Sequence, residues 1–201
     1  MDKRRLTPAS IFVAMVAAVL MLSACGGSAD YAPKPRGFFR INFPDKAYQT
    51  YNSTGCPFTF DYPKYAAIEP DRNPKAKPCW LNMQYKQFNA TLHLSYQPVT
   101  SKKEFNQLVE DAHKLSFKHT VKANWIDQGI IRYPERNIYG IYYTIDGNAA
   151  SSAQFFLTDS TKHYLRGALY FNSEPRLDSI QPVLTFIKKD VDVMIKSFKW
   201  K

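Results

Sequence analysis

The side chains most able to carry chemistry in this chain are its three cysteines. Cys25 ends the stretch LSAC at residues 22–25, while Cys56 and Cys79 lie in the sequences GCPF and KPCW. A thiol can be acylated, oxidised to a disulfide or bound to a metal ion, and its surroundings decide which reaction occurs. The sequence around each cysteine therefore predicts what that cysteine does.

Cys25 follows a segment that is built like a secretory signal peptide. Three basic residues lie among the first five positions, and an apolar run fills residues 11–24. This run is shorter than the ~20 apolar residues of a membrane-spanning helix. The stretch LSAC resembles the lipobox of bacterial lipoproteins, whose cysteine becomes the first residue and receives acyl chains. We expect a signal peptide over residues 1–24 and a palmitate-bearing anchor on Cys25; a cleaved signal with a chance cysteine is the alternative.

Cys56 and Cys79 are the two cysteines that remain in the exported part of the chain. An oxidising envelope usually joins such a pair, and the prolines beside both cysteines favour turns. A metal site is the alternative, but no Cys-x-x-Cys stretch or clustered histidine pair supplies further ligands. We therefore expect a disulfide between Cys56 and Cys79 and no metal.

The other polar side chains show no catalytic pattern. The sequence has no nucleophile elbow, Walker loop, dinucleotide fingerprint or His-Glu-x-x-His stretch. His93 lies between Leu92 and Leu94, on the expected polar side of a strand, and His113 and His119 lie among lysines. These positions predict solvated histidines. We expect neither an enzyme nor a bound cofactor.

Basic residues outnumber acidic ones by 27 to 17, which gives a formal net charge of +10. The signal peptide removes nucleic acid from the expected partners, because the envelope contains little of it. Anionic lipid headgroups, cell-wall polymer or an acidic protein face remain, and a merely solvated basic surface is the alternative. The basic residues cluster at Lys75 and Lys77, Lys102 and Lys103, residues 114–122 and residues 188–201.

Alternation of apolar and polar residues predicts that most of the exported chain forms strands. Residues 63–78 hold four prolines and are expected to be an exposed loop between two of them. The other connections are short and rich in turn residues, which favours antiparallel neighbours. The expected strands are residues 58–62, 81–85, 92–96, 125–133, 138–145, 153–158 and 164–171.

Two helices are expected to pack on this sheet. The first begins at a Ser-x-x-Glu capping box formed by Ser101 and Glu104. Its apolar face comprises Phe105, Leu108, Val109, Ala112 and Leu115. The second is expected over residues 182–198, with Pro182 in its first turn. Its apolar stripe comprises Leu184, Ile187, Val191, Met194, Ile195 and Phe198.

This order of elements predicts an α+β domain over residues 45–201. It would contain a twisted antiparallel sheet of about six or seven strands with helices packed on it. The ending IKSFKW, after a meander of strands, is similar to PsbP-type sandwiches. That similarity concerns the fold and carries no function.

Residues 25–44 are expected to connect the anchor to this domain, and their second half is unusual. The stretch YAPKPRGFFRINFP at residues 31–44 carries prolines that stiffen the chain, two arginines, and aromatics that would expose much apolar surface if left in water. One interpretation is a strap packed on the domain; the other is a face that binds a partner. The candidate partner-binding residues are Tyr31, Lys34, Arg36, Phe38, Phe39 and Arg40.

Two sequence motifs resemble those of a known protein family. The stretches PKPRGFFRINFPDKAY and CPFTFDYPKYA, together with the lipobox, resemble the gliding motility lipoprotein GldD family of Bacteroidota. The resemblance implies a non-catalytic lipoprotein needed for gliding and for type IX secretion, acting beside other envelope lipoproteins and membrane proteins. It implies no catalytic residue.

The same resemblance bears on location and modification. A single acidic residue, Asp30, follows the anchor, which favours the periplasmic face of the outer membrane over export to the cell surface. Related organisms O-glycosylate Asp-Ser/Thr motifs, so Ser160 and Ser179 are candidate acceptors; plain turns are the alternative.

A second function is an envelope lipoprotein that binds a glycan or a lipid. Thirteen tyrosines and fourteen phenylalanines motivate it, because an aromatic-rich sheet can form a cleft for such a ligand.

The lipobox generates a direct test. Replacing the thiol in Cys25→Ala should abolish incorporation of an alkyne-labelled palmitate, because acylation starts at that sulfur. The unchanged sequence is the control. Labelling that persists in the variant would show that the anchor lies elsewhere.

Overall fold

Seven of the described strands form one antiparallel sheet in the order β3-β4-β5-β9-β8-β7-β6. The computed structural model describes residues 8–9, 12–13, 15–16, 37, 40–173 and 176–201. The chain divides into the units Met1–Arg40 and Ile41–Lys201, and this sheet belongs to the second. Its strands are β3 (Ala67–Pro70), β4 (Leu81–Tyr85), β5 (Ala90–Pro98), β6 (Ala123–Tyr133), β7 (Ile138–Gly147), β8 (Ser151–Thr158) and β9 (His163–Phe171).

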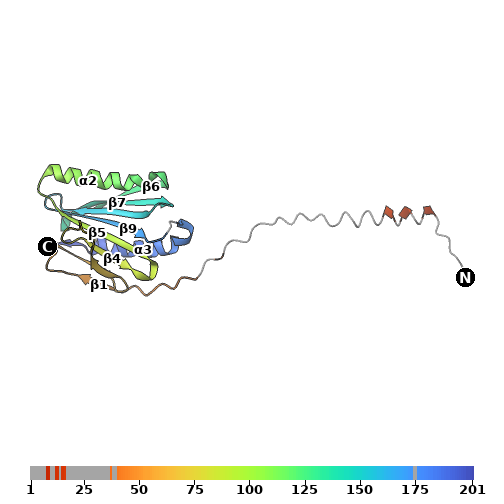
Figure 1. Ribbon diagram of the computed structural model, residues 1–201, viewed down its shortest axis with the longest axis horizontal. Coiled ribbons are helices and arrows are strands. Elements are labelled where there is room, and N and C mark those ends of the chain that lie inside the picture. Colours follow the sequence, from red (N-terminus) through yellow and green to blue (C-terminus); the bar gives the residue numbers. More distant parts are fainter. Residues whose placement is uncertain (1–7, 10–11, 14, 17–36, 38–39, 174–175) are drawn as a thin grey trace. The chain divides into compact units, whose positions relative to one another are not determined.

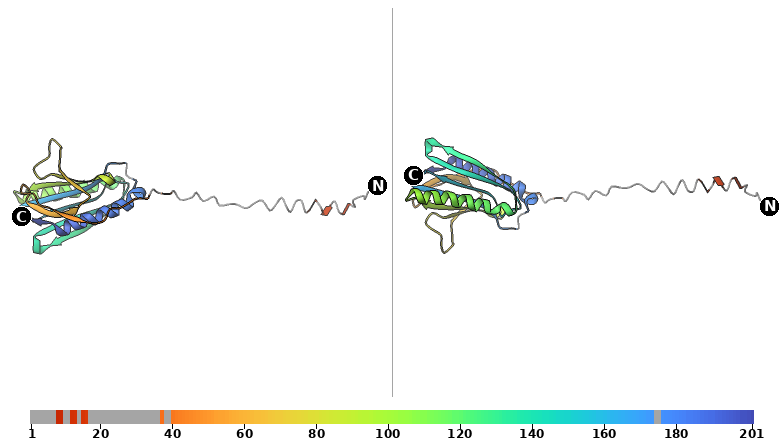
Figure 2. Two further views of the ribbon diagram at one scale, coloured as in Figure 1. Left: turned by 90° about the horizontal axis from the view of Figure 1, so that it is seen from below. Right: turned by 90° about the horizontal axis from the view of Figure 1, so that it is seen from above.

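Helices lie on both faces of this sheet. Helix α2 (Lys102–Phe117) covers one face, and α3 (Leu177–Ser197) covers the other (Figure 1). A small antiparallel sheet of β1 (Tyr48–Tyr51), β2 (Phe58–Pro63) and β10 (Lys199–Trp200) lies on the α3 side. The two views of Figure 2 show this side and the α2 side in turn. The α+β prediction, with a sheet of about six or seven antiparallel strands, is confirmed.

Strand alternation divides the buried side chains between the two faces. In β8, Phe155 and Leu157 join the larger core beneath α3, while Phe156 joins the smaller cluster beneath α2. The α3 core also holds the ring stack of Phe58, Phe60 and Phe198. The α3 face therefore contains most of the buried apolar surface, and burial of such surface is the main source of stability.

Local sequence signals set most element ends. The Ser101 hydroxyl accepts a hydrogen bond from the Glu104 amide at 3.2 Å and caps α2. The Glu104 carboxylate turns back to accept from the amide and hydroxyl of Thr100. Asn89 and Asn137 adopt left-handed backbone angles after the short 3-10 turns η2 (Lys86–Phe88) and η4 (Pro134–Arg136). Asparagine tolerates that conformation well, so these turns return the chain antiparallel.

The proline-rich stretch and the start of the last helix differ from the sequence prediction. Residues 63–78 are not a single exposed loop, because β3 forms within them and pairs with β4. Helix α3 begins at Leu177, so Pro182 lies inside the helix and not in its first turn. The Asn148 side chain accepts a hydrogen bond from the Leu177 amide at 2.9 Å, and this contact caps the earlier start.

Two burial predictions were also wrong. Leu115 is 37% exposed, and the small Ser116 lies buried against the sheet in its place. His93 is half-buried, with its Nδ1 2.7 Å from the Asn82 side-chain oxygen and its ring against Tyr170. Its neighbours across the sheet cover it, and this burial lowers the pKa of His93.

A disulfide joins Cys56 and Cys79, with their Cα atoms 5.6 Å apart. Cys56 precedes β2 of the small sheet and Cys79 precedes β4 of the large one. The bond therefore ties the two sheets together covalently.

This disulfide should contribute measurably to stability. On the chain-entropy model, closing a loop of this length contributes about 3 kcal/mol to the free energy of unfolding. The double variant Cys56→Ser, Cys79→Ser should lose about that amount in urea unfolding. Unchanged protein with its disulfide reduced is the matched control and should show a similar loss. An unchanged midpoint in both would contradict this role.

Candidate functional site

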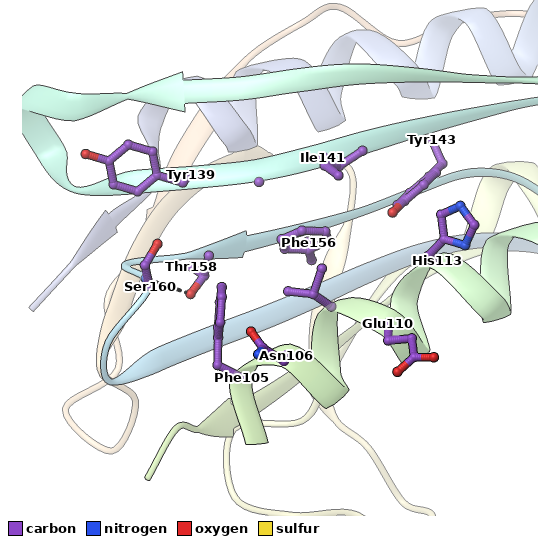
Figure 3. Close-up of a pocket in the computed structure, with 12 residues that line it drawn as sticks. Phe105, Asn106, Glu110, His113, Tyr139, Ile141, Tyr143, Phe156, Thr158 and Ser160 are labelled. Carbon is purple, nitrogen blue, oxygen red and sulfur yellow. Dashed lines mark hydrogen bonds between the residues drawn. The ribbon is translucent and has the colours of Figure 1, made fainter. Parts of the chain in front are cut away.

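A pocket of about 620 Å³ lies between α2 and strands β7 and β8 (Figure 3). Pockets that bind small molecules usually have volumes of about 300–1,000 Å³ and mainly apolar walls. The walls here come from Phe105, Val109, Tyr139, Gly140, Ile141, Tyr143 and Phe156, and the polar side chains at the rim are Asn106, Glu110, His113, Thr158 and Ser160.

The pocket is formed by side chains of α2 and of the strand faces opposite it. From β7, Ile141 and Tyr143 face α2, while Gly140, just before Ile141, presents no side chain. A Cβ atom on Gly140 would meet the Phe156 carbonyl oxygen at 1.9 Å, so a glycine is required for β7 to approach β8 this closely. Phe105 and Val109 are four positions apart on α2 and therefore face the same way.

The rim residues do not form a catalytic arrangement. Glu110 pairs with Lys114 at 2.7 Å, one turn further along α2. His113 stacks on Phe117 with ring centroids 4.2 Å apart, and the Thr158 hydroxyl accepts the Ser160 amide at 2.9 Å. No group of three metal-binding side chains occurs within the described part of the chain. The pocket is thus suited to binding an apolar molecule.

A second polar cluster centres on Asp190, which lies in α3 and whose side chain is fully buried. The Lys46 ammonium donates to Oδ1 at 2.5 Å, and it also lies 3.7 Å from the Phe186 ring centroid. The Tyr48 hydroxyl donates to Oδ1 at 2.9 Å, and the Tyr65 hydroxyl donates to Oδ2 at 2.5 Å. Three donors therefore compensate one buried carboxylate.

The two tyrosines of this cluster remain protonated at physiological pH. Burial and the hydrogen bond to Asp190 raise the pKa of Tyr48 to about 12, and the same causes raise that of Tyr65 further. The Asp190 cluster is therefore a fixed structural contact. Sequence reasoning missed it; the available signal was an aspartate next to Val191 in the apolar stripe of α3.

The first residues of the domain also pack on α3 and its surroundings. Ile41 packs against the larger core, and the Phe43 ring lies 4.6 Å from that of Phe186. The Gln87 side chain donates to the Asn42 carbonyl at 2.7 Å. The chain is therefore held to the domain from Ile41 onward.

Most of the sequence-predicted site residues lie outside the described residues or on the surface. Arg40 is exposed, Ser160 is exposed in the β8–β9 turn, and Ser179 is exposed in the first turn of α3. None of these three lies at the Asp190 cluster, and only Ser160 reaches the pocket rim. Their proposed roles stay predictions. Those outside the described residues are Cys25, Tyr31, Lys34, Arg36, Phe38 and Phe39.

The fold and the pocket define a class: an α+β sandwich domain with an apolar, ligand-sized pocket beneath one helix. The sequence model of the gliding motility lipoprotein GldD matches residues 28–200, and the chain belongs to that family. It is thus a gliding motility-associated lipoprotein of the cell envelope, which confirms the family expected from the two motifs. In the described part of the chain, no helix combines the length and apolar character needed to cross a membrane.

Comparisons with individual proteins add little. No curated protein matches the chain significantly. The solution structure of cyanobacterial PsbP (CyanoP) from Synechocystis sp. PCC 6803 is similar, with 14% sequence identity and a TM-score of 0.44. The match covers 81% of this chain and 98% of that one. A likeness this distant carries no conclusion about function.

The Asp190 cluster predicts a large stability difference between two aspartates of α3. Asp190→Ala should lower the free energy of unfolding by about 3 kcal/mol, because it removes the acceptor shared by Lys46 and two buried hydroxyls. Asp192→Ala, at an exposed site two residues on, should change it by less than about 0.5 kcal/mol. Urea unfolding measures both, and equal losses would contradict the cluster's role.

Proposed function

We propose that this chain is a non-catalytic assembly lipoprotein of the gliding motility and type IX secretion machinery. The observation that carries the proposal is the family match across residues 28–200, nearly the whole exported chain. The rim of the pocket supports it, since Glu110 pairs with Lys114 and His113 stacks on Phe117, so the two titratable groups are not aligned on a common reaction centre.

The proposal places the protein on the periplasmic face of the outer membrane, held by acyl chains on Cys25. The contacts of Ile41 and Phe43 would then fix the domain close to the end of its tether. A domain fixed in this way presents a defined surface to its neighbours at little entropic cost.

The partner-binding surface in this proposal is the segment just before those contacts. Arg36 and Arg40 would offer planar donors to carboxylates or carbonyls of another envelope lipoprotein or membrane protein, and Phe38 and Phe39 would supply apolar area.

The test is a gene deletion with complementation. Deletion should abolish both colony spreading and type IX secretion, and the unchanged gene should restore both. Cys25→Ala should fail to restore either, because the domain would leave the membrane. Normal spreading and secretion in the deletion strain would overturn the proposal.

The proposed partner surface is tested by complementing the same deletion strain with variants of that segment. Arg36→Ala with Arg40→Ala should impair spreading while the protein stays at normal abundance by immunoblot. Lys102→Ala with Lys103→Ala removes the same charge from the exposed start of α2 and is the matched control. Equal impairment by both pairs would reject the segment as the partner surface.

A further inference from the structure

A row of polar side chains crosses the sheet beneath α2, next to the pocket. Tyr143 of β7 is the register partner of Gln154 of β8, so the two side chains are direct neighbours on one face. Arg166 of β9 donates to the Gln154 side-chain oxygen, and the Ser116 hydroxyl of α2 donates to the same oxygen at 3.3 Å. The row therefore runs from the pocket wall at Tyr143 to Arg166.

The row holds hydrogen-bond donors that lack acceptors. The Tyr143 hydroxyl and the Gln154 side-chain nitrogen are buried, and neither has a hydrogen-bond partner among the described residues. Because Arg166 and Ser116 both donate to the Gln154 oxygen, the amide orientation is fixed and its nitrogen faces away from them. Buried polar groups in proteins are nearly always bonded, so two neighbouring exceptions need an explanation.

The row also carries a positive charge without a counter-ion. Arg166 is half-buried, and none of the ion pairs among the described residues includes it. Burial and then the charge of Arg166 lower the pKa of His119. Burial also raises the pKa of Tyr143, so its hydroxyl keeps the proton that it can donate.

The donors of Tyr143, Gln154 and Arg166 indicate which kind of ligand would bind here. A carboxylate is an acceptor-only anion, and it complements two neutral donors and a guanidinium. The adjoining pocket walls from Phe105, Val109, Ile141 and Phe156 are apolar and suit a hydrocarbon chain. A glycan fits poorly, because its many hydroxyls would lie against walls that offer few partners.

We propose that the space between α2 and strands β7–β9 binds a single-chain fatty acid. Its hydrocarbon chain occupies the pocket of about 620 Å³, and its carboxylate accepts hydrogen bonds from Tyr143, Gln154 and Arg166. The site uses none of the residues of the partner surface proposed above, and binding to the purified protein does not depend on the assembly role.

Access to the row requires α2 to move. The Tyr143 hydroxyl and the Gln154 nitrogen are covered, and the residues of α2 that lie buried are the small Ala112 and Ser116. The larger apolar side chains of α2 are only partly buried, so this helix buries less apolar area than α3 does on the other face. An outward shift of its C-terminal half would open the path from the pocket to the row.

The chain part of the site is tested with a matched pair of tryptophans. The mature chain carrying Cys25→Ala, which has no lipid of its own, is titrated with cis-parinaric acid and followed by fluorescence. Asn106→Trp places a ring in the pocket mouth and should weaken binding at least about tenfold, equivalent to ~1.4 kcal/mol. Gln107→Trp makes the same change one position along the exposed helix surface and should leave binding within about twofold.

The carboxylate part of the site is tested by two head-group variants. Arg166→Met should weaken binding about tenfold or more. Tyr143→Phe should weaken it several-fold while leaving the melting temperature equal or higher, because it removes an unpartnered buried hydroxyl. Tyr133→Phe is the control, since Tyr133 of β6 does not line this pocket and packs against the core on the other face of the sheet.

Competing ligands complete the test. Palmitate should displace the probe at least about tenfold more effectively than hexadecanol, which has the same chain without the carboxylate. Absence of saturable probe binding would overturn the whole site. Equal displacement by both ligands, with no effect of Arg166→Met, would overturn the head-group assignment and leave a purely apolar pocket.

Discussion

The buried carboxylate of Asp190 is the contact on which the arrangement of the domain depends. It accepts hydrogen bonds from Lys46, Tyr48 and Tyr65, which lie near the start of the domain, while Asp190 itself lies in the last helix. A buried charge is stable only when its partners are in place. The cluster therefore fixes the small sheet and the entry of the chain on the α3 side, where the apolar core is also largest.

This distribution leaves the α2 side with different properties. Helix α2 is well capped at Ser101, so it forms readily, but its fully buried side chains are small and its larger apolar ones are only partly buried. The result is a well-capped helix over an incompletely filled interface. A pocket lies on one side of this interface, and the unpartnered donors of Tyr143 and Gln154 lie beneath the helix. Stability and binding capacity are thus separated between the two faces of one sheet.

For an envelope lipoprotein, this separation is useful. The α3 face holds Ile41 and Phe43 near the start of the domain, so the chain enters the domain on the side with the larger core. The disulfide between Cys56 and Cys79 reinforces the same region by joining the two sheets. The α2 face can then change its packing without disturbing the contacts of Ile41 and Phe43, because α2 and α3 lie on opposite faces of the sheet.

The sequence by itself determined the features that depend on neighbours along the chain. Alternation placed six of the seven sheet strands, the Ser-x-x-Glu box placed the start of α2, and two motifs identified the family. Only the tertiary structure decided the rest. Strand β3 needed β4 beside it, α3 began early because Asn148 caps it, and Lys46 met Asp190 across 144 positions. A periodic pattern reports which face of an element is apolar, but not which distant polar group will lie opposite it.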